Sequence, residues 1–215
     1  MKTTRTRFAP SPTGYLHVGG VRTALFAWLV ARQTDGKFIL RLEDTDKKRE
    51  VKGSGEHLVK SLKTLGINYD EGPDIGGPYA PYRQSQRLDH YKKWAQKLID
   101  NGRAYADPYT AAEVQAFREQ AQKAKKPFLY RNHRPANPPK WDGGQPLRFK
   151  SDPKKYSWHD EVMGDLSTGP EVIDDIIIIK SDGYPTYNFA HIIDDYEMKI
   201  SHIIRGQEFL ASVPN

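Results

Sequence analysis

The segment 7–20, which reads RFAPSPTGYLHVGG, holds the residues best suited to bind a nucleotide. A strand end, a turn stiffened by two prolines and the first turn of a helix follow one another there, and a helix N-terminus offers unpaired N–H donors and positive dipole charge to phosphate. Gly19 and Gly20 leave room for a base or ribose against the backbone. His17 adds a donor that can follow charge developing on phosphate oxygens. Since His-x-Gly-x alone also begins many ordinary helices, the predicted nucleotide cradle depends on the whole segment.

The elements around this segment predict a parallel sheet. Residues 3–9 are typical of a strand, and residues 19–34 carry apolar side chains at the i, i+3, i+4, i+7, i+8 spacing of a helix with one buried face. Gly36 is expected to end that helix. A second strand over 37–42 and a second helix over 54–65 complete a strand–helix–strand–helix order. Such a sheet binds its ligand outside the carboxyl ends of its strands.

The pattern changes after residue 81, where an α+β segment is expected to interrupt the sheet. Its predicted helices cover 84–100 and the residues after Thr110, which begins a capping box with Glu113. Prolines prevent long regular elements over 127–146. The remaining expected elements are strands at 147–150, 156–162 and 171–180, followed by a helix at 186–196 and a strand at 199–205 that return to the first layer.

Charge is unevenly distributed along the 215 residues, whose net charge is +6. Residues 114–155 carry 11 Lys/Arg and 3 Asp/Glu, whereas residues 156–215 carry 3 and 11. The basic block includes Tyr130, Trp141 and Phe149, so it is either a surface for a polyanion or a solvated basic loop region. The chain has no cysteine, which excludes disulfides, a thiol nucleophile and a thiolate zinc site and fits a cytoplasmic protein. We expect no membrane-spanning segment and no secretory signal.

The segment 7–20 resembles the signature region of bacterial-type glutamyl-tRNA synthetases, class I enzymes whose nucleotide motif is written His-Ile-Gly-His. The last position is Gly20 here, which removes one donor to ATP. The run APSPT at 9–13 differs from the Pro-Glu-Pro-Asn of the glutaminyl branch and therefore favours glutamate. Further segments resemble the family in the same order, at 38–46 (FILRLEDTD), 65–73 (LGINYDEGP), 81–85 (PYRQS), 180–190 (KSDGYPTYNFA) and 204–212 (IRGQEFLAS).

The resemblance implies a Rossmann-like parallel-sheet catalytic domain interrupted by an α+β insertion that binds the tRNA acceptor stem. Its first half would be 1–81, the insertion 82–183, and the return 184–215. The family's Lys-x-Ser-Lys loop and anticodon-reading domain are not found in the sequence, so we expect the N-terminal catalytic portion, truncated at its C-terminus. Whether the isolated chain is active stays open.

The resemblance also implies the site residues. Glutamate would be bound by a set of side chains with matching charge, namely Arg7, Ser11, Glu43, Tyr187 and Arg205. Two guanidinium groups suit two carboxylates, with Arg7 expected on the side-chain carboxylate and Arg205 on the α-carboxylate, although the sequence leaves that assignment open. Glu43 and Ser11 would accept from the ammonium, and Tyr187 would donate to a carboxylate. ATP would contact Thr13, His17, Gly19, Gly20 and Glu208, of which His17, Gly19 and Gly20 are the expected catalytic group.

The implied reaction is the ATP-dependent activation of L-glutamate to glutamyl-adenylate and its transfer to the 3′ end of tRNA(Glu). Mg²⁺ would enter with ATP, without a dedicated metal site and without zinc. Asp44, Asp46, Asp194 and Asp195 are expected to cap loops or to contact the tRNA end, and His191 to line the site or to pack. The expected state is a monomer with no membrane partner.

Two alternatives remain open from the sequence. One is the related short enzyme that attaches glutamate to a modified base of tRNA(Asp), which commonly carries a cysteine zinc site that this chain lacks. The other is a noncatalytic module that binds the tRNA acceptor. Such a module would bind tRNA with a steep salt dependence but would show no glutamate-dependent pyrophosphate exchange.

Overall fold

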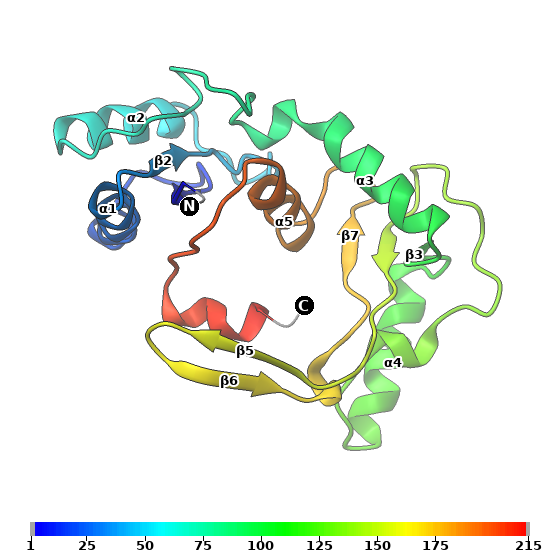
Figure 1. The fold of residues 1–215 in the computed structure, drawn as a ribbon. Coiled ribbons are helices and arrows are strands. Elements are labelled where there is room, and N and C mark those ends of the chain that lie inside the picture. Colours follow the sequence, from blue (N-terminus) through cyan, green and yellow to red (C-terminus); the bar gives the residue numbers. More distant parts are fainter. Residues whose placement is uncertain (1–2, 214–215) are drawn as a thin grey trace. The chain divides into compact units, whose positions relative to one another are not determined.

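The computed structural model describes residues 3–213 and shows a mixed α/β chain (Figure 1). The chain divides into two compact units. Unit 1 comprises Met1–Tyr91 and Tyr187–Leu210, and unit 2 comprises Lys92–Thr186 and Ala211–Asn215.

Unit 1 is built on a short parallel sheet. Strand β1 (Arg5–Phe8) pairs in parallel with β2 (Lys37–Leu40), and isolated bridges join Ile39 to Glu71 and Leu42 to Arg83. Helices α1 (Val18–Gln33) and α2 (Ser54–Thr64) follow the two strands, and α5 (Tyr187–Glu197) comes late in the chain. The predicted strand–helix–strand–helix order and the parallel pairing are confirmed.

Alternation along the strands sends apolar side chains to one face of the sheet. Phe8, Phe38, Leu40 and Leu42 are buried in one core cluster with side chains of α1 and α2. The intervening positions carry Arg7, Ile39, Arg41 and Glu43, and Ile39 packs with Met198, just beyond α5. One face therefore builds the core, and the other brings buried charge toward α5.

Helix α1 lies close to the sheet because its buried face is made of Ala24, Ala27 and Ala31. The Thr6 hydroxyl donates to the carbonyl of Ala27 at 2.7 Å. Gly36 follows the helix as predicted, but the left-handed residue is Asp35, with φ of 48°. Gly36 is required for a different reason, since a Cβ there would lie 2.4 Å from the carbonyl oxygen of Thr4.

Unit 2 contains two antiparallel sheets. Strands β3 (Ala104–Ala106), β4 (Leu147–Phe149) and β7 (Ile177–Ile179) form one in the order β3-β4-β7, and β5 (Tyr156–Asp160) and β6 (Gly164–Thr168) form a hairpin. Helix α3 (Leu88–Asp100) runs from the end of the first segment of unit 1 into unit 2.

Helix α4 (Ala111–Lys123) starts as predicted. The side chain of Thr110 accepts from the backbone of Glu113, and the Glu113 carboxylate accepts from the backbone of Thr110. The capping box is therefore confirmed. The region 127–146 holds only the short 3-10 helix η2 (Tyr130–His133) among its described elements, as its prolines predict.

Several predicted boundaries are wrong. The expected strand 171–180 is reduced to β7, and the 3-10 helix η3 (Pro170–Val172) occupies its start. The Asp174 carboxylate accepts from the backbone N–H groups of Tyr130 and Arg131. The residues before β7 are therefore held against a loop and not against a strand. The expected helix 84–100 begins with the 3-10 helix η1 (Gln84–Gln86) before α3. Two strands were not predicted from the sequence: β3, because it has only three residues, and β6, because it is largely polar.

The expected strand 199–205 is irregular, and the chain continues into the 3-10 helix η4 (Gln207–Ser212). The Arg5 N–H donates to the Ser201 hydroxyl at 2.7 Å instead of to a carbonyl. The N–H groups of Ser201 and His202 both donate to the Arg5 carbonyl, at 2.9 and 3.2 Å. Because a side chain and a shared acceptor replace the regular exchange of backbone bonds, no ladder forms between residues 199–205 and β1.

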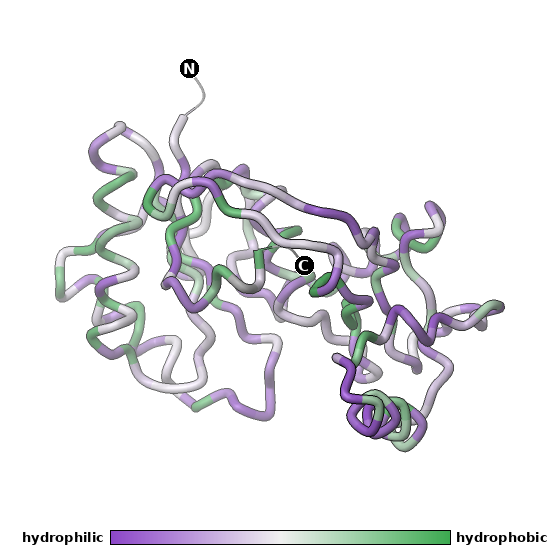
Figure 2. The backbone as a smooth tube through the Cα atoms, turned by 90° about the horizontal axis from the view of Figure 1, so that it is seen from below, coloured by the Kyte–Doolittle hydropathy of each residue, from purple (hydrophilic) through white to green (hydrophobic). Residues whose placement is uncertain are grey.

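Hydrophobic stretches along the backbone are short and interrupted by hydrophilic ones (Figure 2). None of the helices within residues 3–213 combines the length and apolarity needed to cross a bilayer.

The close approach at Gly36 makes a stability prediction. Gly36→Ala should lower the free energy of unfolding by about 1–3 kcal/mol, because the added methyl group meets the Thr4 backbone, which cannot move without breaking its hydrogen bond to Lys37 at the start of β2. Gly14→Ala is the matched control, since a Cβ there meets nothing within 4 Å. Urea denaturation measures both variants, and equal stabilities would contradict the packing described.

Candidate active site

The candidate site lies in unit 1, where the parallel strands end. Beyond the assigned strands the pairing continues, since Arg41 N–H donates to the Phe8 carbonyl at 3.0 Å and Glu43 N–H donates to the Pro10 carbonyl at 3.0 Å. The loop carrying Pro10 therefore lies beside the segment carrying Glu43. All the sequence-predicted site residues belong to unit 1.

Four buried charged groups alternate in sign on the face toward α5. Arg7 donates through Nε to both carboxylate oxygens of Asp195 at 3.1 Å. Arg41 donates through Nη1 to Asp195 at 2.7 Å and through Nη2 to Oε1 of Glu43 at 2.9 Å. Arg41 is fully buried, and Arg7, Glu43 and Asp195 are 5%, 4% and 8% exposed. The order Arg7–Asp195–Arg41–Glu43 is called the charged chain below.

The acidic members of the charged chain respond differently to their surroundings. Burial opposes ionisation of Asp195, but Arg41 and Arg7 together outweigh it, so the pKa of Asp195 lies below its ordinary value. Burial raises the pKa of Glu43, although Arg41 opposes that change. Glu43 therefore has less cationic support than Asp195, and a further cation beside it would favour its charged form.

Arg205 brings a third cation to the same neighbourhood. Its guanidinium donates through Nη2 to the Tyr187 hydroxyl and lies 4.5 Å from the centre of the Phe209 ring. Burial, followed by repulsion from Arg7, lowers the pKa of Arg205, while Glu43 opposes that shift. The Tyr187 hydroxyl accepts from Arg205 and keeps its own proton to donate.

His191 packs against this group. Its ring is stacked on Tyr187 with centroids 4.6 Å apart, and its Nδ1 lies 2.7 Å from the Tyr187 carbonyl. A carbonyl only accepts, so Nδ1 carries the proton of the neutral ring and Nε2 is an acceptor. Burial lowers the pKa of His191. The expected packing role agrees with this stacked position.

The start of α1 carries three of the predicted nucleotide-binding residues, His17, Gly19 and Gly20. His17 is its N-cap, and the imidazole Nδ1 accepts from Gly19 N–H at 3.2 Å. In the neutral ring Nε2 therefore carries a proton that it can donate. A Cβ at Gly19 would lie 2.9 Å from His17 Cε1, and one at Gly20 would lie 2.8 Å from Leu16 Cδ1. Glycine at position 19 thus allows the ring to cap the helix.

The remaining sequence-predicted residues lie at the surface. Ser11 and Thr13 are exposed in one turn, where Thr13 N–H donates to the Ser11 carbonyl at 2.9 Å. Glu208 is exposed on η4. The described contacts do not join these three side chains to the charged chain.

The roles predicted for two of the four aspartates are wrong. Asp194 and Asp195 are buried in α5 rather than capping loops or facing a tRNA. Asp194 accepts from Arg87 Nε at 2.7 Å and from Gln84 Nε2 at 2.9 Å.

The other two aspartates cap loops as expected. Asp44 accepts from the backbone and hydroxyl of Ser85, and Asp46 accepts from the backbone of Arg49.

Arg41 and Asp195 were not among the predicted site residues. A signal was available, because Arg41 interrupts the apolar run 38–42 of a strand whose two faces are both covered. A buried arginine needs an acidic partner, and residues 194–195 are the adjacent acidic pair in a predicted helix. What the sequence could not supply is which of the two acids faces the strand.

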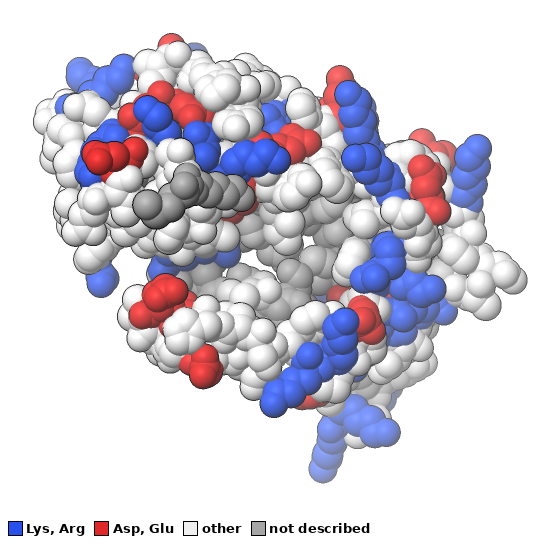
Figure 3. All heavy atoms as spheres, in the orientation of Figure 1, with Lys and Arg blue, Asp and Glu red and all other residues white. Residues whose placement is uncertain are grey.

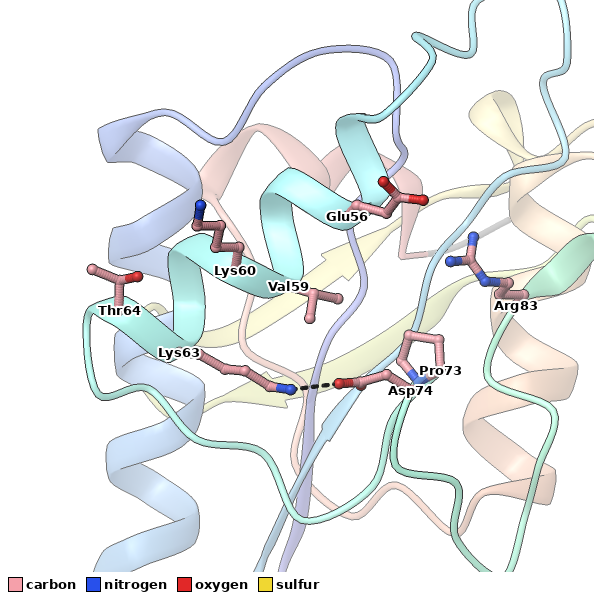
Figure 4. Close-up of a pocket in the computed structure, with 8 residues that line it drawn as sticks. All are labelled: Glu56, Val59, Lys60, Lys63, Thr64, Pro73, Asp74 and Arg83. Carbon is pink, nitrogen blue, oxygen red and sulfur yellow. Dashed lines mark hydrogen bonds and ion pairs between the residues drawn. The ribbon is translucent and has the colours of Figure 1, made fainter.

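No group of three or more His, Asp or Glu side chains within residues 3–213 is arranged to hold a metal ion. A separate pocket of about 390 Å³ lies along α2, lined by Glu56, Val59, Lys60, Lys63, Thr64, Pro73, Asp74 and Arg83 (Figure 4). Lys63 and Asp74 form an ion pair of 2.6 Å in it. It contains none of the sequence-predicted site residues.

Comparison with known proteins places the chain in a family. Residues 3–215 match the family described as tRNA synthetases class I (E and Q), catalytic domain. The chain belongs to this family.

The similar proteins within this family are glutamate–tRNA ligases. A glutamate–tRNA ligase of Clostridium botulinum (strain Hall) is 46% identical over 218 residues, which cover 98% of this chain and 45% of the relative. Glutamate–tRNA ligase 1 of Syntrophomonas wolfei is 46% identical over 100% of this chain and 45% of its own length. The crystal structure of a glutamate tRNA ligase from Elizabethkingia meningosepticum, in complex with its amino acid, matches with a TM-score of 0.90 and 40% identity over 99% of this chain and 45% of that one. This chain spans about half the length of the relatives it matches.

The lowered pKa of His191 predicts a pH-dependent contribution to stability. The folded protein binds this proton less readily than the unfolded chain, whose histidine titrates near about 6.5. Stability is therefore retained above that pH and falls as the pH drops below it. His191→Gln should remove the part of the stability loss at low pH that this histidine causes. Urea denaturation at a series of pH values measures it. An NMR titration midpoint of His191 at or above the ordinary value would contradict the burial described.

Proposed function

We propose that this chain is the amino-acid-activating part of a glutamate–tRNA ligase. The observation that carries the proposal is the linked set Arg7–Asp195–Arg41–Glu43 at and beyond the ends of parallel strands, in a chain 46% identical to a glutamate–tRNA ligase. In this interpretation unit 1 is a Rossmann-like fold, and the insertion predicted at 82–183 separates its two halves.

The charges of the site complement free glutamate. Arg7, Arg41 and Arg205 supply three positive charges, and Glu43 and Asp195 supply two negative ones. Two carboxylates would be bound by Arg7 and Arg205, with the Tyr187 hydroxyl donating beside Arg205, and the ammonium would lie at Glu43. Glutamine lacks one of these carboxylates and leaves a cation unpaired.

The start of α1 would bind the phosphates of ATP. The glutamate α-carboxylate oxygen attacks the α-phosphorus, a new P–O bond forms, and the bond to pyrophosphate breaks. A ribose hydroxyl at the 3′ end of tRNA then attacks the glutamyl carbonyl and releases AMP. His17 Nε2 and the backbone N–H groups of the first turn would stabilise charge on the phosphates. Mg²⁺ would neutralise phosphate charge, held by phosphates and water.

Unit 2 would bind the acceptor stem of tRNA(Glu). Lysine and arginine side chains project from the part of unit 2 around α4 (Figure 3). Residues 114–155, which include most of α4, carry 11 Lys/Arg and 3 Asp/Glu. Contacts to phosphate from such a surface position a duplex without reading its sequence. The inferred setting is the cytoplasm, where tRNA, ATP and glutamate meet.

Calorimetric titration of this chain with glutamate and with glutamine tests the proposal. Glutamate should bind and glutamine should bind at least about tenfold more weakly, because a neutral amide cannot match a carboxylate at an arginine. Arg205→Gln should weaken glutamate binding by a similar factor. Arg32→Gln is the control, since Arg32 pairs with Asp70 on the other side of the sheet, at α1. Equal binding of the two amino acids would contradict the proposal, as would an unaffected Arg205→Gln.

The cradle at α1 makes a separate prediction for ATP. Gly19→Ala places a methyl group against the His17 ring, removes the helix cap and should raise the Kd for ATP by about tenfold. Glutamate affinity of the same variant should stay unchanged. Titration with each ligand measures both, and an unchanged ATP affinity would remove Gly19 and His17 from the cradle.

A further inference from the structure

We propose that Asp195 and Arg41 form a positioning pair that sets the orientation and separation of Arg7 and Glu43, the two groups at the ends of the charged chain. The inference rests on the proposed function, because it concerns how the same amino acid is bound.

The contacts leave the ends of the charged chain available to a ligand. Among the residues that the structure describes, Arg7 meets its acceptor through Nε alone, so both terminal nitrogens are left for a carboxylate. Glu43 accepts from Arg41 through Oε1, and Oε2 is left for an ammonium. Neither the terminal nitrogens of Arg7 nor Oε2 of Glu43 are among the buried polar atoms that lack a hydrogen-bond partner. A carboxylate at one end and an ammonium at the other are what a free amino acid presents.

The middle of the charged chain is held by several contacts. Arg41 is fully buried and donates through its two terminal nitrogens to Asp195 and Glu43. Its Nε lies 3.7 Å from Asp194, an ion-pair distance at which no hydrogen bond forms. Asp194 is itself fixed by Arg87 at 2.7 Å and by the Tyr91 hydroxyl at 2.9 Å. The positioning pair is thus supported by Arg87, just before α3, and by Tyr91 in the first turn of α3. A guanidinium that bridges two carboxylates transmits this fixed position to both ends.

The positioning pair also sets the charge at each end. Without Asp195, two guanidinium groups would lie on one buried face with no acid between them, and Arg7 would be driven apart from Arg41. Without Arg41, Glu43 and Asp195 would be two acids with no cation between them. The spacing of the ligand-binding groups therefore depends on a pair that need not touch the ligand.

Asp195→Asn is the direct test, because it keeps the shape and removes the charge. We expect the Kd for glutamate to rise by about tenfold or more, the preference for glutamate over glutamine to shrink, and the Kd for ATP to stay unchanged. Asp195→Glu should restore part of the affinity. The matched control is Asp175→Asn, since Asp175 is 1% exposed and also pairs with an arginine, Arg134, but lies in unit 2. It should leave glutamate affinity unchanged.

The outcomes separate this inference from the proposed function. Failure of the unaltered chain to bind glutamate overturns the proposed function and with it the inference. Glutamate binding by the unaltered chain together with unchanged affinity in folded Asp195→Asn overturns the inference alone. If Asp195→Asn does not fold, Arg41→Lys is the second test, because lysine keeps the charge but lacks the planar guanidinium whose two terminal nitrogens donate to Asp195 and to Glu43. The same loss of glutamate affinity supports the positioning pair, and unchanged affinity overturns it.

Discussion

The ion pair between Arg41 and Asp195 is the interaction on which the site depends. An arginine with no exposed surface sits where a covered parallel strand would ordinarily carry an apolar side chain. Its burial is tolerable only with carboxylates on more than one side, and removal of one partner from such a buried pair costs about 3–5 kcal/mol. Helix α5 supplies the acid at 2.7 Å. The same contact that holds α5 to the sheet therefore also orients Arg7 and Glu43.

Fold and site are linked through the period of two along β1 and β2. Phe8, Phe38, Leu40 and Leu42 face the core cluster, and the residues between them face α5. A slip of one residue would turn the core side chains toward α5 and the charges toward α1, so the apolar core fixes the register that presents the charges. The geometry of the candidate site and the stability of the fold are in this way set by one pattern.

Much of the fold could be predicted from local sequence. The apolar spacing of α1, the parallel pairing and the capping box of α4 are local signals, and the structure bears them out. Residues 199–205 could not be assigned correctly, because the Ser201 hydroxyl replaces a ladder bond to Arg5 across nearly the whole chain. Asp195 was misread for the same reason, since its role is set by Arg7 and Arg41, far away in sequence. The resemblance of the motifs predicted the candidate ligand-binding residues. The residues that hold them in place, Arg41 and Asp195, could be identified only from the structure.

A crystal structure of this chain with bound glutamate tests the central claim most directly. It should show a ligand carboxylate at about 3 Å from the terminal nitrogens of Arg7 and the ammonium at a similar distance from Glu43 Oε2, with the Arg41–Asp195 contact intact. Glutamate seated away from both groups, or an Arg41–Asp195 contact broken on binding, would contradict the account.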